Sequence, residues 1–314
     1  MTETRDPALE ERLKAADNMF RSRKFAEALP LYETLAKDAE AVGQRGIAME
    51  AYAQHARAIS LTSKDLPAGE PILAKAFEVG DDTLPLGWSR ALGVRGIYQR
   101  ERGKPAEAKK TFEIMYEYCV AKGLHSRAID ATHHLAILVP PAEQIPYALK
   151  GIKAAEDGGE ATAGWLGPLW NNLGNSYHDL ERWDEALEAF EKAEHYHDKS
   201  GRPMAMMIAD WAVGRALRMV GRLDEAEARL TETEAWAQKL EAEDSGSTAK
   251  EFRGMCKHEL GLLDGTRGRP AEGLKKLRAA RAIYVEVGYP DHWPKGMTII
   301  DGEIAELEKQ AKGS

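Results

Sequence analysis

Two arginines and a tryptophan at helical spacing are the side chains of this sequence best suited to holding a ligand. Arg215 and Arg218 lie close to one helical turn apart, so one carboxylate could meet both guanidinium groups. Trp211 precedes them and could bury an apolar side chain, as the aromatic anchors of binding interfaces do. The alternative is that the arginines pair inside the protein with Asp179 or Asp210. The spacing therefore indicates either capture of an acidic partner side chain or an internal ion pair.

A second group of residues could bind a metal ion. Asp130, His133 and His134 fall at helical spacing, so the aspartate and one histidine share a helix face, and His178 could supply a further ligand. A metal site needs further ligands that converge from elsewhere and second-shell groups that orient each imidazole, and nothing in the sequence indicates either. Since histidines on solvated helix faces are common, we predict no metal site here and no cofactor.

Composition and motifs exclude several classes of protein. The formal charge of -8 argues against general affinity for nucleic acid or anionic membranes, because both require dense lysine and arginine. No glycine-rich phosphate loop precedes a helix and no Gly-x-Ser-x-Gly motif occurs, so we predict that the protein is not an enzyme. The N-terminus lacks an apolar signal core and no run approaches transmembrane length, so we expect a cytoplasmic protein.

The elements that must position these side chains recur along the chain. A turn followed by a short helical signature returns at intervals that are multiples of about forty residues. The small residue of that signature falls at Ala28, Ala108, Ala186, Ala226 and Gly273. A fixed period in this range predicts a stacked array, in which no unit can bury its apolar face alone.

The clearest unit lies between Trp170 and Ala193 and reads as two helices joined by a turn at Glu181-Arg182-Trp183. Its apolar and small residues are Trp170, Leu173, Gly174 and Tyr177 in the first helix, and Ala186, Phe190 and Ala193 in the second. These residues closely resemble the tetratricopeptide repeat, a family that expects these residue types at these offsets; only the closing proline is displaced, to Pro203. The period exceeds the usual repeat of about thirty-four residues, which places the chain with the long-period variety. The resemblance implies an all-α fold, a right-handed α-solenoid of helix pairs.

The same frame divides the whole chain. We expect about seven tetratricopeptide-like pairs within residues 1–290, beginning near residues 9, 50, 89, 129, 167, 207 and 254. A polar segment at 243–247 reads as a loop before the last pair. Residues 291–314 are predicted to form a C-terminal capping helix and tail, with Ile299, Ile300, Ile304 and Leu307 on its apolar side.

In the tetratricopeptide family the first helices of the pairs line a concave groove, and the resemblance assigns groove residues here. They are Asn171, Asn175 and His178 in the fifth pair, Trp211, Arg215 and Arg218 in the sixth, and Asp130 and His133 in the fourth. The earlier pairs contribute Asp17, Gln54, Arg90 and Arg100. An asparagine at the place of Asn175 commonly clamps the backbone of a bound peptide, since its amide both donates and accepts. The alternative is that Asn175 bonds a neighbouring helix.

These inferences predict a non-catalytic scaffold for protein–protein interaction. Its partner protein or peptide would lie in the concave groove, centred on the fifth and sixth pairs, because preformed grooves bind extended or helical segments at modest ordering cost. The alternative is a regulatory sensor whose superhelix responds to a small peptide or metabolite. A change of shape on ligand addition would distinguish the sensor from the scaffold. The partner's identity and the oligomeric state stay open.

Overall fold

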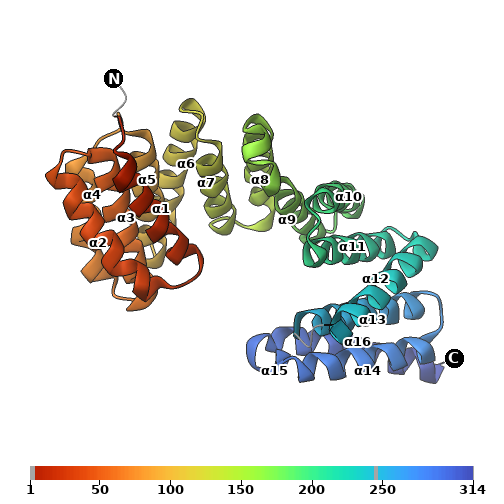
Figure 1. Cartoon of the computed structure of the whole chain (residues 1–314). Helices are drawn as coiled ribbons and strands as arrows, with labels where there is room; N and C mark the ends of the chain where they lie inside the picture. Colours follow the sequence, from red (N-terminus) through yellow and green to blue (C-terminus); the bar gives the residue numbers. More distant parts are fainter. Residues whose placement is uncertain (1–3, 244–246, 314) are drawn as a thin grey trace. The chain divides into compact units, whose positions relative to one another are not determined.

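The computed structural model describes residues 4–243 and 247–313, and all regular structure in them is helical (Figure 1). Successive helices form pairs: α1 (Pro7–Arg21) with α2 (Phe25–Ala41), α3 (Arg45–Thr62) with α4 (Leu66–Val79), α5 (Pro85–Glu101) with α6 (Pro105–Ala121), α7 (His125–Ile137) with α8 (Pro141–Asp157), α9 (Leu166–Asp179) with α10 (Trp183–Ser200), α11 (Pro203–Met219) with α12 (Leu223–Glu243), and α13 (Ser247–Thr266) with α14 (Pro270–Glu286). The short α15 (Tyr289–His292) and the long α16 (Pro294–Gly313) follow. The all-α solenoid of helix pairs predicted from the sequence is confirmed.

The recurring signature of the sequence is the turn within each pair. Gly103, Gly221 and Gly268 each follow the end of a first helix with a positive φ, of 72°, 83° and 69°. Glycine adopts this left-handed conformation without the steric cost that a side chain imposes, and it ends a helix for that reason. A proline in the first turn then starts α6 and α14, where its missing N–H needs no partner.

Each clear pair closes around a glycine of its first helix. A Cβ on Gly174 would lie 2.5 Å from Cε1 of Phe190, and one on Gly96 would lie 2.6 Å from Cζ of Phe112. Gly214 and Gly261 lie in the same way beneath Leu230 and Leu277. These four large side chains on the second helices are fully buried. The glycine of the repeat is therefore required for close packing between the two helices of a pair.

The chain divides into two compact units, Met1–Ala163 and Gly164–Ser314. Two 3-10 turns, Gly159–Ala161 and Ala163–Trp165, lie between α8 and α9. A single array over residues 1–290 with a cap over 291–314 stays a prediction. Of the loop expected at 243–247, residues 244–246 lie outside the described residues. None of the described helices is both long and apolar enough to cross a membrane.

Helix α16 packs against α14 and α13 in the second unit. Its buried side chains are Met297, Ile300 and Leu307, and Ile304 is partly buried beside them. Ile299 is 43% exposed, so its place on the apolar side of this helix was wrong. Ile299 and Ile300 are adjacent and lie about 100° apart around a helix, and only Ile300 is turned toward α14.

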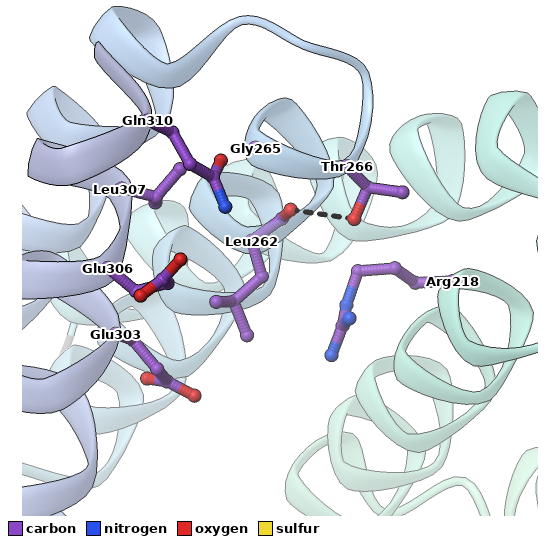
Figure 2. Close-up of a pocket in the computed structure, with 8 residues that line it drawn as sticks. All are labelled: Arg218, Leu262, Gly265, Thr266, Glu303, Glu306, Leu307 and Gln310. Atoms are coloured by element: carbon purple, nitrogen blue, oxygen red, sulfur yellow. Dashed lines mark hydrogen bonds between the residues drawn. The ribbon is translucent and has the colours of Figure 1, made fainter. Parts of the chain in front are cut away.

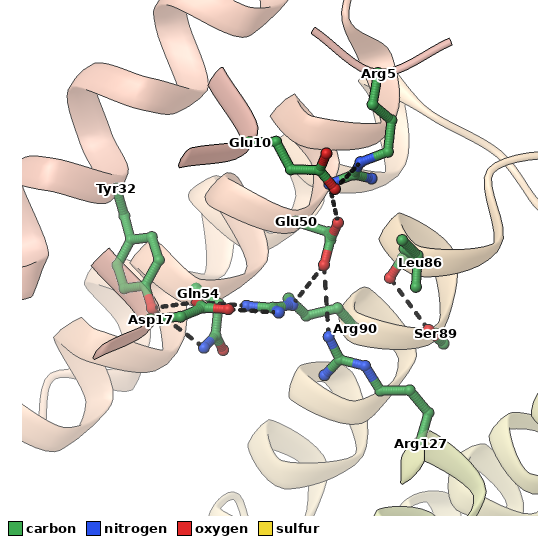
Figure 3. A network of polar contacts seen from close by, with 10 residues as sticks. All are labelled: Arg5, Glu10, Asp17, Tyr32, Glu50, Gln54, Leu86, Ser89, Arg90 and Arg127. Carbon is green, nitrogen blue, oxygen red and sulfur yellow. Dashed lines mark hydrogen bonds and ion pairs between the residues drawn. The ribbon is translucent and has the colours of Figure 1, made fainter. Parts of the chain in front are cut away.

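In the first unit, Asp17 of α1 and Arg90 of α5 form a buried ion pair, shown in Figure 3. The two guanidinium Nη atoms of Arg90 donate to the two carboxylate oxygens of Asp17, at 2.7 and 2.8 Å. The Tyr32 hydroxyl donates to the same carboxylate at 2.7 Å and accepts from the Gln54 amide at 3.4 Å. Asp17 and Arg90, which the sequence assigned to the groove with Gln54, therefore bind each other, and Gln54 joins them through Tyr32.

Glu50 of α3 continues this network toward α7 (Figure 3). Glu50 is 2% exposed, and its carboxylate accepts from Arg5 at 2.9 Å. It forms an ion pair with Nε of Arg90 at 2.9 Å and a longer one with Arg127 of α7 at 3.5 Å. The network therefore links α1, α3, α5 and α7 through charges that water reaches poorly.

Candidate functional site

The side chains predicted to bind a partner in the second unit project from two adjacent first helices. Asn171, Asn175 and His178 lie on α9, and Trp211, Arg215 and Arg218 lie on α11. All six are half-buried. In each triplet the spacing of four and then three residues puts the side chains on one helix face.

Arg215 joins the two helices. Its Nη2 donates to Oδ1 of Asn175 at 3.0 Å. In this structure Asn175 therefore bonds a neighbouring helix, which is the alternative considered for it from the sequence.

The guanidinium of Arg215 is packed against aromatic rings. Its central carbon lies 4.5 Å from the ring centre of Trp211 and 5.8 Å from that of Phe190. Such stacking stabilises a cation and holds the planar group in one orientation. Burial lowers the pKa of Arg215, and the charge of Glu259 opposes that effect without forming an ion pair within the described residues.

Two N–H donors at this place are buried and lack an acceptor. They are Nε of Arg215 and Nε1 of Trp211, and neither reaches a hydrogen-bond acceptor within the part of the chain that the structure describes. A buried donor without an acceptor costs about 1–3 kcal/mol. The face between α9 and α11 is therefore short of acceptors.

Arg218 differs from Arg215 because it has a carboxylate partner. Its Nη2 lies 2.7 Å from Oε2 of Glu259, and its Nε donates to the same oxygen at 2.8 Å. The partner expected among Asp179 and Asp210 was wrong for Arg218, and Asp210 pairs instead with Arg229. The charge of Arg218 is thus neutralised by Glu259, whereas Arg215 has no carboxylate partner among the described residues.

Sequence reasoning missed Glu259. The frame that aligns Gly214 with Gly261 puts His258 in the place of Trp211, so the seventh pair could have been read in the same way. His258 lies 2.5 Å from Oε2 of Glu303 and 3.2 Å from the Tyr284 hydroxyl. Extending the frame would have brought Glu259, next to His258, into view.

Arg218 also borders a pocket of about 260 Å³ between α11, α13 and α16. Figure 2 shows Arg218 on one side and the Glu303 and Glu306 carboxylates across the space. The remaining lining residues are Leu262, Gly265, Thr266, Leu307 and Gln310. A Cβ on Gly265 would lie 2.6 Å from Cδ2 of Leu307, so the glycine lets α16 approach α13 closely. The pocket extends the polar face of α11 toward the last helix.

His178 completes the face on α9. Its ring packs edge-on against Trp183, with 5.0 Å between ring centres, and its Nδ1 lies 3.8 Å from Oδ1 of Asp179. Burial, followed by the charge of Arg215, lowers the pKa of His178. The histidine is therefore a neutral imidazole near pH 7, which can donate one hydrogen bond and accept another.

Asp130 and His133 lie on α7 in the first unit, and both are exposed. His134 beside them stacks on Phe112 with 4.6 Å between ring centres, and burial lowers its pKa to about 4. Within residues 4–243 and 247–313 no group of three histidine, cysteine or acidic side chains is arranged to hold a metal ion.

Comparisons with known proteins agree with this architecture. The tetratricopeptide repeat model matches residues 168–195, which include most of α9 and α10. A Signal Transduction ATPase with Numerous Domains protein with a tetratricopeptide repeat sensor, from Pyrococcus horikoshii, superposes with a TM-score of 0.68 at 18% identity and covers 95% of this chain. This chain spans 43% of that protein's length.

Two further solved structures share the fold. The apo form of RapI has a TM-score of 0.57 at 12% identity, covering 97% of this chain and 85% of RapI. BtubC from P. vanneervenii has a TM-score of 0.52 at 18% identity, covering 75% of this chain and 93% of BtubC. No curated protein matches the sequence.

Stacked helix pairs closed around a recurrent glycine, with polar side chains gathered on first helices, define a helical-repeat protein of the solenoid class. Residues 168–195 match the tetratricopeptide repeat, and the described helices share the fold of solved tetratricopeptide repeat structures.

Proposed function

We propose that the chain is a non-catalytic interaction scaffold and that its second unit binds a partner protein or peptide on the face shared by α9 and α11. The residues in contact with the partner would be Asn171, Asn175, His178, Trp211, Arg215 and Arg218. The observation that supports this proposal is the state of Arg215, a largely buried guanidinium without a carboxylate partner among the described residues.

A hydrogen-bond acceptor from a partner would satisfy the buried donor of the Arg215 guanidinium that has no acceptor among the described residues. The guanidinium offers donors in a fixed planar fork, and here one donor reaches Asn175 while Nε has no acceptor among the residues that the structure describes. A partner carboxylate or backbone carbonyl would add charge-assisted hydrogen bonds, which are stronger than neutral ones. Stacking on Trp211 keeps the fork in place before binding, which lowers the ordering cost.

The neighbouring side chains suit an extended segment. Asn171 and Asn175 lie one turn apart and present amides that donate to and accept from a peptide backbone. Trp211 offers a half-buried ring for an apolar side chain of the partner. Because Glu259 neutralises Arg218, an acidic side chain of the partner is directed to Arg215, and Arg218 can take part only if it exchanges Glu259 for the partner.

The test is a pull-down from source-cell lysate with matched variants whose folding is verified by circular dichroism. Asn175→Ala removes the amide, Arg215→Met keeps the stem over Trp211 but removes the charge, and Trp211→Phe keeps a ring but removes the indole N–H. The control is Arg222→Met, an exposed arginine that pairs with Glu225 three residues further along. We expect a partner that wild type and the control retain and that Asn175→Ala and Arg215→Met lose.

Retention of every captured protein by Asn175→Ala and Arg215→Met would refute the assignment of this face. Binding of the purified partner is then measured by isothermal titration calorimetry. A loss of about tenfold or more in Arg215→Met is expected, because charge-assisted hydrogen bonds contribute about 1.5–3 kcal/mol each.

A regulatory sensor is the second candidate function. It is favoured by the division into two compact units with Gly158, Gly159 and Gly164 at the short turns between α8 and α9. One structure of the same fold also carries a tetratricopeptide repeat sensor in its name. Small-angle scattering with and without the partner distinguishes the two functions: a sensor changes its radius of gyration on binding, whereas a scaffold adds only the volume of the partner.

A further inference from the structure

The first unit contains a pocket at a place where the stacking of helices is interrupted. Helix α5 packs extensively on α3 and α6 but only lightly on α4, which is short and has Pro71 in its interior. A pocket of about 410 Å³ opens beside this joint, lined by residues of α4 and α5 and by the start of α6. Leu73 and the ring of Tyr98 form its apolar part.

Arg95 lines this pocket and has no anionic partner. Its guanidinium carbon lies 3.4 Å from the ring centre of Phe77, which itself packs edge-on against Trp88 at 5.4 Å. No carboxylate of the described residues forms an ion pair with it, and burial lowers the pKa of Arg95 without any opposing charge. The aromatic stack fixes the plane of a cation that still lacks an acceptor.

The other two cations of the pocket are already matched. Arg102 pairs with Glu70 at 2.5 Å, and Lys104 pairs with Glu107 at 3.1 Å. Among these lining side chains one positive charge, that of Arg95, therefore stays uncompensated.

Gln99 adds a second donor to the pocket. Its Oε1 accepts from the Thr111 hydroxyl at 2.6 Å, so this bond orients the amide and leaves its NH₂ group to donate. The Tyr98 hydroxyl is used elsewhere, because it donates to the carbonyl oxygen of Ala56 at 2.7 Å. Apart from the ion-paired carboxylates of Glu70 and Glu107, the polar groups that Arg95 and Gln99 offer to this pocket are therefore donors.

We propose that this pocket binds a small organic monocarboxylate, with Arg95 holding the carboxylate, the Gln99 amide donating to it, and Leu73 and Tyr98 contacting its apolar part. A planar guanidinium matches a carboxylate in a two-pronged contact. A single negative charge balances the single uncompensated cation, whereas the second charge of a phosphate dianion would add repulsion from Glu70 and Glu107, which also line the pocket. This site lies in the first unit and does not rest on the partner-binding face of α9 and α11.

The test uses the full-length chain with benzoate as the probe and benzamide as its neutral isostere. The Nε–Hε signals of arginine are followed by ¹⁵N-resolved NMR, and the Arg95 signal is assigned by its loss in Arg95→Lys. Titrations are repeated with Arg95→Met, which keeps the stem over Phe77, and in every protein the affinity is taken from the side-chain NH₂ signals of Gln99, which lines the same pocket. The matched control is Arg45→Met, an exposed arginine of the same unit that pairs with Asp81.

We expect benzoate to shift the Arg95 signal saturably and benzamide to leave it unchanged. Affinity for benzoate should fall by about tenfold or more in Arg95→Met and stay unchanged in Arg45→Met, since a charge-assisted two-pronged contact is lost only in the first. Inorganic phosphate at the same concentration should produce a smaller shift.

Absence of a saturable Arg95 shift in the wild-type chain would overturn the proposal, and this result does not depend on the folding of any variant. Equal affinity for benzoate in Arg95→Met and Arg45→Met would overturn it as well. A shift produced only by an acidic peptide, and not by benzoate, would replace the small carboxylate with a protein partner.

Discussion

Replacing Arg90 with methionine removes the cation that joins two buried carboxylates in the first unit. Asp17 and Glu50 are 8% and 2% exposed, and Arg90 contacts both. Asp17 would keep only the Tyr32 hydroxyl and the more distant charge of Arg127. Removing one partner of a buried ion pair costs about 3–5 kcal/mol, because the remaining charge stays buried. We expect Arg90→Met to destabilise the first unit by about this amount at pH 7.

The loss should depend on pH in a direction that the structure determines. Burial by itself would raise the pKa of Asp17, but the hydrogen bonds and charge of Arg90, with Tyr32, hold that pKa below its ordinary value. The group therefore contributes stability that is present above its unfolded pKa of about 3.9 and is lost as the pH falls through the lower folded pKa. Without Arg90, burial dominates and raises the pKa of Asp17. As the pH falls, Asp17 therefore becomes protonated, and its buried charge is removed, at a higher pH in the variant than in the wild type. The difference between the two proteins should narrow as the pH falls below about 5.

Hydrogen exchange followed by mass spectrometry on peptides of α1, α3 and α5 measures this difference for the first unit alone. The control is Arg12→Met, which breaks an exposed ion pair with Asp38 and should cost no more than about 1 kcal/mol. The double variant Asp17→Asn with Arg90→Met should recover part of the loss, since it removes one of the stranded charges. Equal losses in Arg90→Met and Arg12→Met, or a loss that grows as the pH falls, would refute this account of the network.

Two further predictions concern the second unit. Gly174→Ala should destabilise it by about 1–3 kcal/mol, because the new Cβ would lie 2.5 Å from Phe190. The control Gly302→Ala places no atom within 4 Å of the new Cβ and should be neutral or stabilising. Thermal melts compare the two variants, and equal melting temperatures would contradict the close packing of Gly174 against Phe190. Glu259→Gln should lower the stability by about 1–3 kcal/mol, because Arg218 loses its carboxylate partner. The same change should strengthen binding of an acidic partner, because the Arg218 guanidinium becomes available to it. Calorimetry with the partner measures the affinity, and weaker binding by the variant would contradict this expectation.

The helix pairs were predictable because their cause is local. The glycine at 174 and the phenylalanine at 190 belong to one pair, and the turn between them is short, so a single repeat contains the information for its own packing. The same frame grouped Asp17, Gln54 and Arg90, and these residues belong to one polar network, although their assignment to a partner-binding groove stays a prediction.

The partners of the charged side chains were less predictable. Asp17 and Arg90 are 73 residues apart, and Arg218 and Glu259 are 41 apart, so each contact depends on how neighbouring pairs rotate against one another. That rotation is set by the summed packing of many side chains rather than by one motif. The prediction for Ile299 was wrong for the same reason. The rotation of α16 about its own axis decides whether Ile299 or the adjacent Ile300 is buried.

Arg90, Arg218, Arg215 and Arg95 differ in whether the chain supplies a carboxylate to pair with each guanidinium group. Arg90 pairs with two buried carboxylates and Arg218 pairs with one. To bind either arginine, a ligand must displace a carboxylate of the chain, and its own contacts must offset the cost of leaving that buried carboxylate unpaired. Arg215 and Arg95 are held in place by aromatic rings, which orient a cation without neutralising it. An acceptor that arrives at either one forms new bonds and breaks no ion pair. We therefore propose these two stacked guanidinium groups, Arg95 in the first unit and Arg215 in the second, as anion-binding positions.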